Sequence, residues 1–263
     1  MRVSRFFAVL TLLSVSFLIG CGSPSSTQLT AVTPPAPLLP AIAASKPVLL
    51  FDGTGTSSDV SAVEGVLGNL NIGYNTVDSS QIEALSEQQL AGYKLIIVPG
   101  GNSITIGQNL SAAVASNIRG AVQQYGTHYL GICAGAFFGA SSVYNGVDLT
   151  GGVSFDFYAD ENKGIHIEPV LITFPSAPPL DVYWQDGPQL TGWGSVVAKF
   201  PDGTPAIVEG QSGRGFVLFT GVHAEAPTDW RGSLPFTSSL SQDVTYAGTI
   251  VSAALSGSPL PHF

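Results

Sequence analysis

Residues His128–Phe137 read HYLGICAGAF, and this stretch decides the fold more than any other part of the chain. Its first five residues suit a buried strand, and the small apolar residues from Ala134 onward suit a helix that begins directly after that strand. Cys133 stands at the junction, with a glycine two residues away on either side. A strand that leads straight into a helix is the repeating unit of an α/β sheet, so the stretch predicts such a domain with a cysteine at the carboxyl end of a strand.

Apolar bursts typical of buried strands alternate with helical patterns on both sides of this stretch. Helices are predicted at residues 59–70, 110–125 and 242–255, where apolar residues recur on one face. After residue 145 the pattern changes to strands and turns without long helices, which predicts a mixed or antiparallel extension of the sheet. We therefore expect an α/β fold with a doubly wound, mostly parallel sheet and a C-terminal antiparallel extension. The predicted strands cover residues 48–51, 74–77, 95–98, 128–132, 165–174, 181–184, 196–200, 206–209 and 215–220.

The first twenty residues have the pattern of an export signal. Arg2 and Arg5 precede an apolar run at 6–19 that is too short to span a bilayer comfortably. The run ends in the sequence LIGC, which resembles the lipobox of bacterial lipoproteins. This resemblance implies that Cys21 is acylated and becomes the mature N-terminus. The alternative is an ordinary cleaved signal peptide with a chance cysteine.

The next segment is predicted to be a tether. Residues 22–46 consist largely of Ser, Thr, Pro and Ala, with no charge before Lys46 and no apolar periodicity. The expected organisation is a lipoprotein signal peptide at 1–20, a lipidated tether at 21–46 and the α/β domain at 47–263. Acyl chains on Cys21 anchor such a protein in the lipid bilayer. Because Gly22 rather than an aspartate follows the cysteine, we expect the cell envelope, on the periplasmic side of the outer membrane if the organism has one.

The charges and the cysteines narrow the possible partners. The chain has 9 basic and 18 acidic residues, and removal of the predicted signal peptide takes away two basic ones, which leaves a net charge of −11. Nucleic acid is therefore not an expected partner. The two cysteines are Cys21 and Cys133, so acylation of the first leaves no intramolecular disulfide in a compartment that favours one. A thiol kept free there suggests a chemical role.

Cys133 is the candidate nucleophile. The positive end of the helix that begins after it favours a thiolate, which attacks carbonyl groups. Gly131 and Gly135 allow a sharp strand-to-helix turn, as in the nucleophile elbow of hydrolases. A cysteine among apolar residues is more often a small core residue, so other segments must discriminate between the two interpretations.

A glycine loop follows the predicted strand at 95–98. The backbone N–H groups of Gly100 and Gly101, together with that of Ala134, can hold an oxyanion at the sheet edge where α/β proteins place their sites. The alternative is a strand-to-helix turn that needs glycine for its dihedral angles.

The predicted strand at 215–220 delivers His223 and Glu225 just past its carboxyl end. An imidazole there can take the thiol proton, and the carboxylate can orient the ring. The alternative is a polar loop after a strand. His166 and Glu168 have the same spacing, but the apolar alternation around them predicts a solvent-facing strand.

These three segments together resemble a known family. They are VPGG at 98–101, YLGICAGAF at 129–137 and GVHAE at 221–225, and they follow one another in the family's order. They look like the glutamine amidotransferase-like domain that occurs at the N-terminus of eukaryotic biotin-protein ligases and alone in bacterial proteins. The resemblance covers about residues 47 to 225. It implies the flavodoxin-like fold of the class I glutamine amidotransferases.

The resemblance also implies roles for single residues. Cys133 corresponds to the nucleophile, His223 to the base and Glu225 to the residue that orients the base. Ala224 stands where family members usually carry a proline, which keeps the spacing but changes the local rigidity.

The expected function is a cysteine-dependent hydrolysis of an amide or peptide bond, without a metal or cofactor. A true amidotransferase passes ammonia to an acceptor usually activated by ATP in a partner domain; no synthetase domain is recognisable here, and an exported protein works where ATP is scarce. The alternative is a non-catalytic binding or scaffolding lipoprotein of the cell envelope. A Cys133 sulfur more than about 5 Å from the His223 ring would favour that alternative.

Some further polar and aromatic residues have less specific interpretations. Four of them can line a substrate cleft, although aromatic residues at strand spacing are more often core or cover. Two histidines are expected to be structural or incidental. The cleft candidates are Tyr183, Trp184, Asp186 and Trp230, and the two histidines are His128 and His262.

Overall fold

The computed structural model describes residues 46–56 and 59–263. The predicted signal peptide, the predicted acylation site Cys21 and the predicted tether up to residue 45 lie outside the described residues. In the described part of the chain, no helix is both long enough and apolar enough to cross a bilayer.

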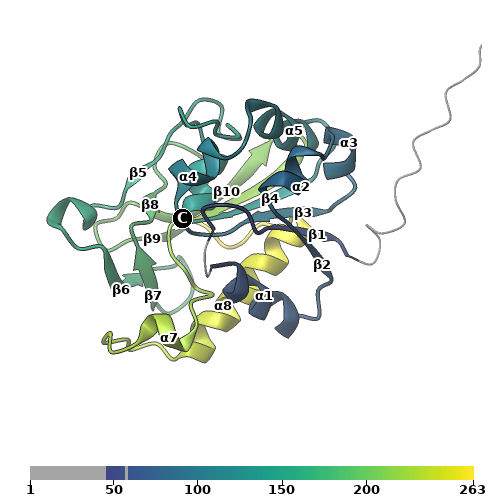
Figure 1. The fold of residues 1–263 in the computed structure, drawn as a ribbon. Coiled ribbons are helices and arrows are strands. Elements are labelled where there is room, and N and C mark those ends of the chain that lie inside the picture. The colour runs from purple at the N-terminus through teal and green to yellow at the C-terminus, as the bar shows by residue number, and fades with distance from the viewer. Residues whose placement is uncertain (1–45, 57–58) are drawn as a thin grey trace, which may run out of the picture. The chain divides into compact units, whose positions relative to one another are not determined.

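A seven-stranded mixed sheet forms the centre of the domain, in the order β2-β1-β3-β4-β11-β10-β9 (Figure 1). The first five strands in this order are parallel, and they have the 2-1-3-4-5 order of flavodoxin-like folds. β10 and β9 continue the sheet in antiparallel fashion, which confirms the predicted extension. The strands are β1 (Val48–Phe51), β2 (Tyr74–Val77), β3 (Leu95–Val98), β4 (His128–Ile132), β9 (Ser195–Lys199), β10 (Pro205–Ser212) and β11 (Gly215–Thr220).

Helices cover both faces of the sheet, because successive residues of the central strands point to opposite sides. Leu130 belongs to one buried cluster with α1 (Asp59–Asn69) and α8 (Leu240–Ser256). Its neighbour Tyr129 belongs to a second cluster with α5 (Ala112–Gln123) and α6 (Ala134–Gly139). Figure 1 shows the two layers on opposite sides of the strands. The central strands are buried on both faces, so they read as continuous apolar runs.

Strands β6 (Ile167–Ile172) and β7 (Leu180–Gln185) correct one expectation. They were expected to extend the main sheet, but they pair with each other in a separate two-stranded antiparallel sheet. An isolated bridge from Thr173 to Lys199 ties this hairpin to β9. Near its end, β7 is hydrogen-bonded to the loop after β11, because the His223 N–H donates to the Tyr183 carbonyl at 2.8 Å. The hairpin thereby reaches the carboxyl edge of the parallel strands.

Several short elements were not predicted from the sequence. α2 (Ser79–Glu83) and α3 (Glu87–Leu90) each begin with a capping box, but they are too short to show an apolar period. The other unpredicted elements are α4 (Ser103–Gln108), β5 (Asp156–Phe157), the 3₁₀ turn η2 (Glu161–Lys163), β8 (Pro188–Gln189) and α7 (Thr228–Arg231).

The ends of the long helices are well defined. α5 is shorter than the expected 110–125, because Ser111 caps it by accepting from the Val114 N–H at 3.3 Å. Gly126, with φ of 84°, turns the chain away beyond it.

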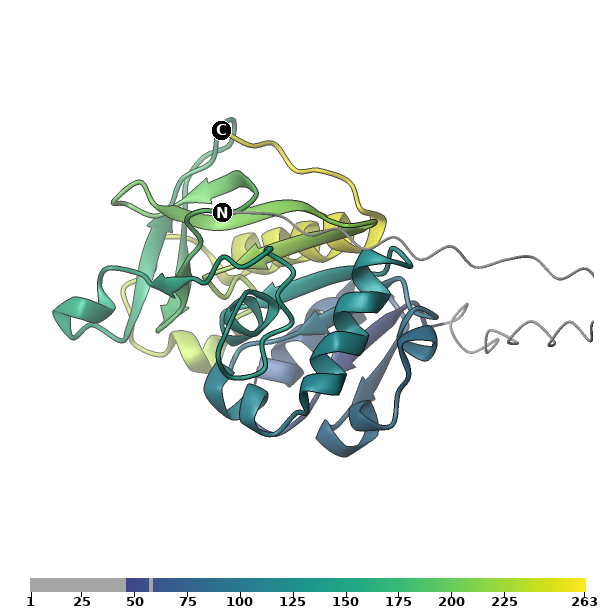
Figure 2. The same ribbon diagram turned by 90° about the horizontal axis from the view of Figure 1, so that it is seen from above.

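After α8 the C-terminal segment runs back to the antiparallel edge of the sheet, where the Phe263 N–H donates to the Val196 carbonyl at 2.9 Å (Figure 2).

Candidate active site

Cys133 lies on a strained turn between β4 and α6. Its φ of 48° and ψ of −104° are outside the usual conformations of a residue with a side chain. The Cys133 N–H donates to the Thr220 carbonyl at the end of β11, at 2.8 Å, which ties the turn to the neighbouring strand. Gly135 allows the close approach to β3, since a Cβ there would lie 1.9 Å from the Val98 carbonyl oxygen. This is the geometry expected of a nucleophile elbow.

His223 and Glu225 follow β11 in a tight, buried loop. The Thr220 hydroxyl donates to the Val222 carbonyl at 2.7 Å and thereby shapes the turn out of the strand. His223 Nδ1 lies 2.9 Å from Glu225 Oε1, and both side chains are almost fully buried. The Glu225 carboxylate therefore fixes the orientation of the imidazole ring. Ala224 keeps the spacing between them.

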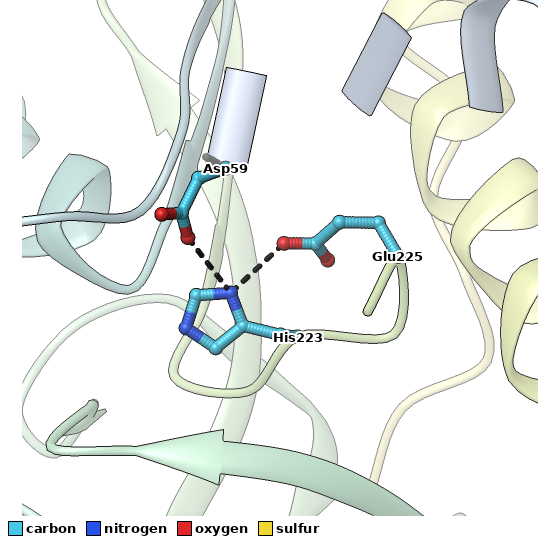
Figure 3. A group of neighbouring side chains, drawn as sticks. All are labelled: Asp59, His223 and Glu225. Carbon is cyan, nitrogen blue, oxygen red and sulfur yellow. Dashed lines mark hydrogen bonds and ion pairs between the residues drawn. The ribbon is translucent and has the colours of Figure 1, made fainter. Parts of the chain in front are cut away.

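Asp59 is a third member of this group that the sequence analysis missed. It is the first residue of α1, and its Oδ1 lies 3.5 Å from His223 Nδ1 (Figure 3). Two carboxylates thus approach one nitrogen of the ring, and the other ring nitrogen points away from both (Figure 3). The signal that would have found it is topological: α1 follows β1, so its N-terminus lies at the same sheet edge as the ends of β4 and β11.

Gly100 gives Asp59 and His223 the space they occupy. A Cβ at residue 100 would lie 2.2 Å from Asp59 Oδ1 and 2.5 Å from His223 Cε1. The glycine after β3 is therefore required by packing against the imidazole and the carboxylate.

The electrostatics of His223 favour the charged ring. Burial lowers its pKa, but the charges of the Cys133 thiolate and the Glu225 carboxylate, and hydrogen bonds with both side chains, outweigh burial and raise the pKa well above its ordinary value. The Cys133 sulfur also lies 3.6 Å from the Gln185 carbonyl oxygen, at the end of β7.

Two hollows meet at Cys133. The larger has a volume of about 660 Å³ and the smaller about 220 Å³, and both are bordered by Gly101, Asn102, Cys133 and Asp186. The larger hollow is also lined by Asp59, Tyr183, His223 and Trp230. The smaller hollow is also lined by Ile104, Ala134, Phe137 and Phe157.

Only two of the three residues expected to hold an oxyanion border the hollows beside Cys133. Gly101 borders both hollows and Ala134 borders the smaller one. Gly100 lies behind them, where it packs against Asp59 and His223.

Three of the four residues expected to line a cleft do line the larger hollow, and the fourth is buried in the core. Tyr183, Asp186 and Trp230 line the larger hollow. Trp184 is fully buried in the core, and its indole N–H donates to the Gly187 carbonyl at 3.1 Å. Alternation along β7 explains the difference, because residues 183 and 184 point to opposite faces.

A polar cluster ties α7, the helix that carries Trp230, to α8. The neighbouring Arg231 forms a buried ion pair with Asp243 of α8 and donates to the Ser238 carbonyl at 2.6 Å. Burial raises the pKa of Asp243 to about 6, although Arg231 opposes the shift. The Trp230 ring lies 5.6 Å from that of Tyr183, measured between centroids.

The other histidines lie elsewhere. His128 Nδ1 lies 2.7 Å from the Ala254 carbonyl oxygen, which joins β4 to α8, as a structural role predicts. His262 is exposed near the C-terminus.

His166 and Glu168, which were expected to face solvent together, differ in their exposure. His166 is exposed and lies 2.8 Å from Asp186 Oδ1. Glu168 is half-buried, and burial, followed by its hydrogen bond with Asp160, raises its pKa to about 7. The expectation of a solvent-facing pair is therefore right for His166 and wrong for Glu168.

Comparison with known proteins finds a family that matches part of the chain. Residues 46–168 match the family Biotin-protein ligase, N terminal. The match includes Asp59 and Cys133, and it ends before His223 and Glu225. No curated protein matches the sequence significantly.

Solved structures match over more of the chain. A glutamine amidotransferase is 20% identical, with a TM-score of 0.52, over 78% of this chain and 100% of its own. PurLQS from Thermotoga maritima is 16% identical, with a TM-score of 0.53, over 79% of this chain and 98% of its own. At these identities the likeness concerns the fold, which is that of the class I glutamine amidotransferases.

Among the described residues, Asp59, His223 and Glu225 are also close enough to hold a metal ion, with potential ligand atoms within 4.8 Å of one another. Both carboxylates approach the same ring nitrogen, so a metal bound there would take the place of the proton on Nδ1. Without a metal, the same two carboxylates stabilise a protonated His223 ring.

Proposed function

We propose that the protein is a thiol-dependent hydrolase of amide or peptide bonds, with Cys133 as nucleophile, His223 as base and Glu225 as the orienting carboxylate. The observation that carries the proposal is the buried His223 ring, which interacts with the Cys133 thiol and lies 2.9 Å from the Glu225 carboxylate. An imidazole so placed takes the thiol proton and is held in one orientation. Asp59 acts as a second positioning residue for the ring.

The proposed reaction has two halves. Sγ of Cys133 attacks the carbonyl carbon, the C–S bond forms, the C–N bond breaks, and His223 gives its proton to the departing nitrogen. The N–H groups of Gly101 and Ala134 receive the oxyanion. Water then attacks the thioester, His223 takes the water proton, and the C–S bond breaks. The products are a carboxylic acid and an amine.

An electrophilic glutamine analogue tests the nucleophile. We expect the analogue to label the wild-type protein and the Cys21→Ser variant, and not the Cys133→Ala variant. The two variants are matched, because each removes one of the chain's 2 cysteines. Equal labelling of Cys133→Ala would contradict the proposal. Selective ligand binding without Cys133-dependent turnover would instead support a binding or scaffolding protein.

We also propose that Cys21 is acylated and holds the protein in the bilayer of the cell envelope. The support is the apolar run before Cys21 and its lipobox-like end. Metabolic labelling with a fatty-acid analogue should mark the wild-type protein and Cys133→Ser, but not Cys21→Ser. Label retained by Cys21→Ser would contradict acylation at that residue.

A further inference from the structure

Three buried side chains converge on one ring nitrogen. Asp59, His223 and Glu225 are each no more than 7% exposed, and their potential ligand atoms lie within 4.8 Å of one another. Glu225 Oε1 lies 2.9 Å from His223 Nδ1, and Asp59 Oδ1 lies 3.5 Å from it (Figure 3). One nitrogen therefore faces two carboxylate oxygens, which is more than a single N–H needs.

The distances suit a transition-metal ion. Zn²⁺ binds imidazole nitrogen and carboxylate oxygen at about 2.1 Å, which places neighbouring ligand atoms roughly 3.0–3.4 Å apart at tetrahedral or octahedral angles. The two measured distances, 2.9 and 3.5 Å, lie just on either side of that range. Small movements of the two carboxylates would complete the geometry.

The charges also favour a divalent ion. A protonated His223 ring carries one positive charge, whereas the carboxylates of Asp59 and Glu225 carry two negative charges. Because unbalanced charge is costly in a buried position, an ion with two positive charges matches these carboxylates better than the Nδ1 proton does.

The larger hollow gives an ion access to the cluster. Asp59 and His223 line this hollow, and a water molecule from it can serve as a further ligand. The rings of Tyr183 and Trp230 lie 5.9 and 5.7 Å from that of His223, between centroids. The imidazole is therefore held in place by its neighbours before an ion binds.

We propose that Asp59, His223 and Glu225 form an inhibitory site for a divalent transition-metal ion such as Zn²⁺, which binds in place of the proton on His223 Nδ1 and releases that proton to solvent. This inference rests on the hydrolase proposed above, because it names a means of regulating the same site. With the ion on Nδ1, the remaining proton of the neutral ring sits on Nε2. The ring then has no lone pair with which to take a proton, so it cannot act as base.

The sulfur of Cys133 lies outside the proposed metal site. Among the described residues, the ligand group around Nδ1 consists of Asp59, His223 and Glu225 without Cys133. Nε2 points away from both carboxylates, so its N–H stays available to stabilise the Cys133 thiolate (Figure 3). The alternative is an ion bound directly to the thiolate, which is itself a good zinc ligand.

Metal binding can be measured on the full-length Cys21→Ser protein, which retains Cys133. Calorimetric titration should show binding of Zn²⁺ and not of Ca²⁺, because Ca²⁺ takes oxygen ligands. In ¹⁵N NMR of the 4 histidines, Zn²⁺ should move the Nδ1 signal that is lost in His223→Gln, while Nε2 of the same ring remains protonated. Absence of Zn²⁺ binding, or a shift confined to Nε2 or to another histidine, would overturn the proposal.

Two aspartates provide a matched pair of variants. Asp59→Asn removes a ligand, whereas Asp186→Asn removes a carboxylate that lines the same hollow and lies outside the ligand group. Zn²⁺ affinity should fall by at least about tenfold in the first variant and stay unchanged in the second. Circular dichroism checks that both fold. Equal affinities of the two folded variants would count against the site.

Alkylation separates the proposed site from an ion on the sulfur. An ion bound to Cys133 would protect the thiolate from iodoacetamide, whereas an ion on Nδ1 leaves the sulfur open to attack. We expect saturating Zn²⁺ to change the alkylation rate of the Cys21→Ser protein by less than about threefold. Strong protection by Zn²⁺ would overturn the proposal.

Binding and labelling together separate this inference from the proposed reaction. Zn²⁺ binding at Nδ1, with equal labelling of wild type and Cys133→Ala by the glutamine analogue, would support the metal site and overturn the hydrolase. Labelling that depends on Cys133, in a protein that does not bind Zn²⁺, would support the hydrolase and overturn the metal site.

Discussion

Replacing Gly100 with alanine should disable the site while leaving the fold intact. The added Cβ would lie 2.2 Å from Asp59 Oδ1 and 2.5 Å from His223 Cε1. Ordinary contacts to a carbon begin at about 3.5 Å, so the carboxylate and the ring must each retreat by about 1 Å. A misplacement of about 1 Å in a reacting group costs roughly 10²-fold in rate. We expect a loss of about that size in the reaction of Cys133.

The assay needs no knowledge of the substrate. The rate at which iodoacetamide alkylates Cys133 at pH 6 reports the thiolate that His223 stabilises, and the protein can carry Cys21→Ser so that one cysteine remains. Circular dichroism checks that the variant folds. Alkylation should slow strongly in Gly100→Ala, because the displaced ring no longer meets the thiolate.

A glycine in α1 supplies the control. Gly65 is exposed, lies on the same helix as Asp59, and has nothing within 4 Å of an added Cβ. Gly65→Ala should alkylate like the wild type and stabilise the helix by up to about 1 kcal/mol. A folded Gly100→Ala protein that alkylates as fast as Gly65→Ala would refute the packing argument.

Three other predictions concern charges in and beside the site. Glu225→Gln should lower the rate at which an electrophilic glutamine analogue labels Cys133 by about 10²–10⁴-fold, because the ring loses its charged orienting partner; a change below tenfold would assign that role elsewhere. Cys133→Ser should lower the pKa of His223, measured by NMR titration, because the thiolate that raises it is gone; an unchanged pKa would mean the two side chains do not interact. The pKa of Asp243 is raised to about 6 from 3.8, so the folded state binds its proton more tightly than the unfolded state, and stability falls as pH rises through that window, by at most about 3 kcal/mol. Denaturant unfolding at pH 4.5 and 7.5 should show this fall in the wild type and less of it in Asp243→Asn; equal falls would place the titration elsewhere.

The sheet could be predicted from the sequence because its central strands are buried on both faces. Such strands appear as unbroken apolar runs. All five predicted parallel strands agree with the structure at both ends, including the less buried strand at residues 74–77. The β6–β7 hairpin could not be placed in the same way. The position of this hairpin depends on backbone contacts with the loop after β11 and with β9. The apolar periodicity of its own sequence carries no information on those contacts.

The positions of the candidate site residues could be predicted where they directly follow a strand. Cys133, His223 and Glu225 follow directly from the ends of β4 and β11. Asp59 was missed because it opens a helix, where an acidic residue is ordinarily explained by the helix terminus. Its role emerges only when the sheet order brings the N-terminus of α1 beside β11.

The ion pair that ties α7 to α8 has a consequence for which residues of this protein can be substituted. Trp230 lines the larger hollow from the four-residue helix α7, and the ion pair between Arg231 and Asp243 ties that helix to α8. Cys133 and His223, in contrast, lie just beyond the ends of β4 and β11, and backbone hydrogen bonds tie them to Thr220 and Tyr183. If the protein is the proposed hydrolase, selectivity and reactivity therefore reside in separable parts of the chain. A library randomised at residues 228–230, with Arg231 kept, should yield proteins that accept different amides while their thiol chemistry stays the same.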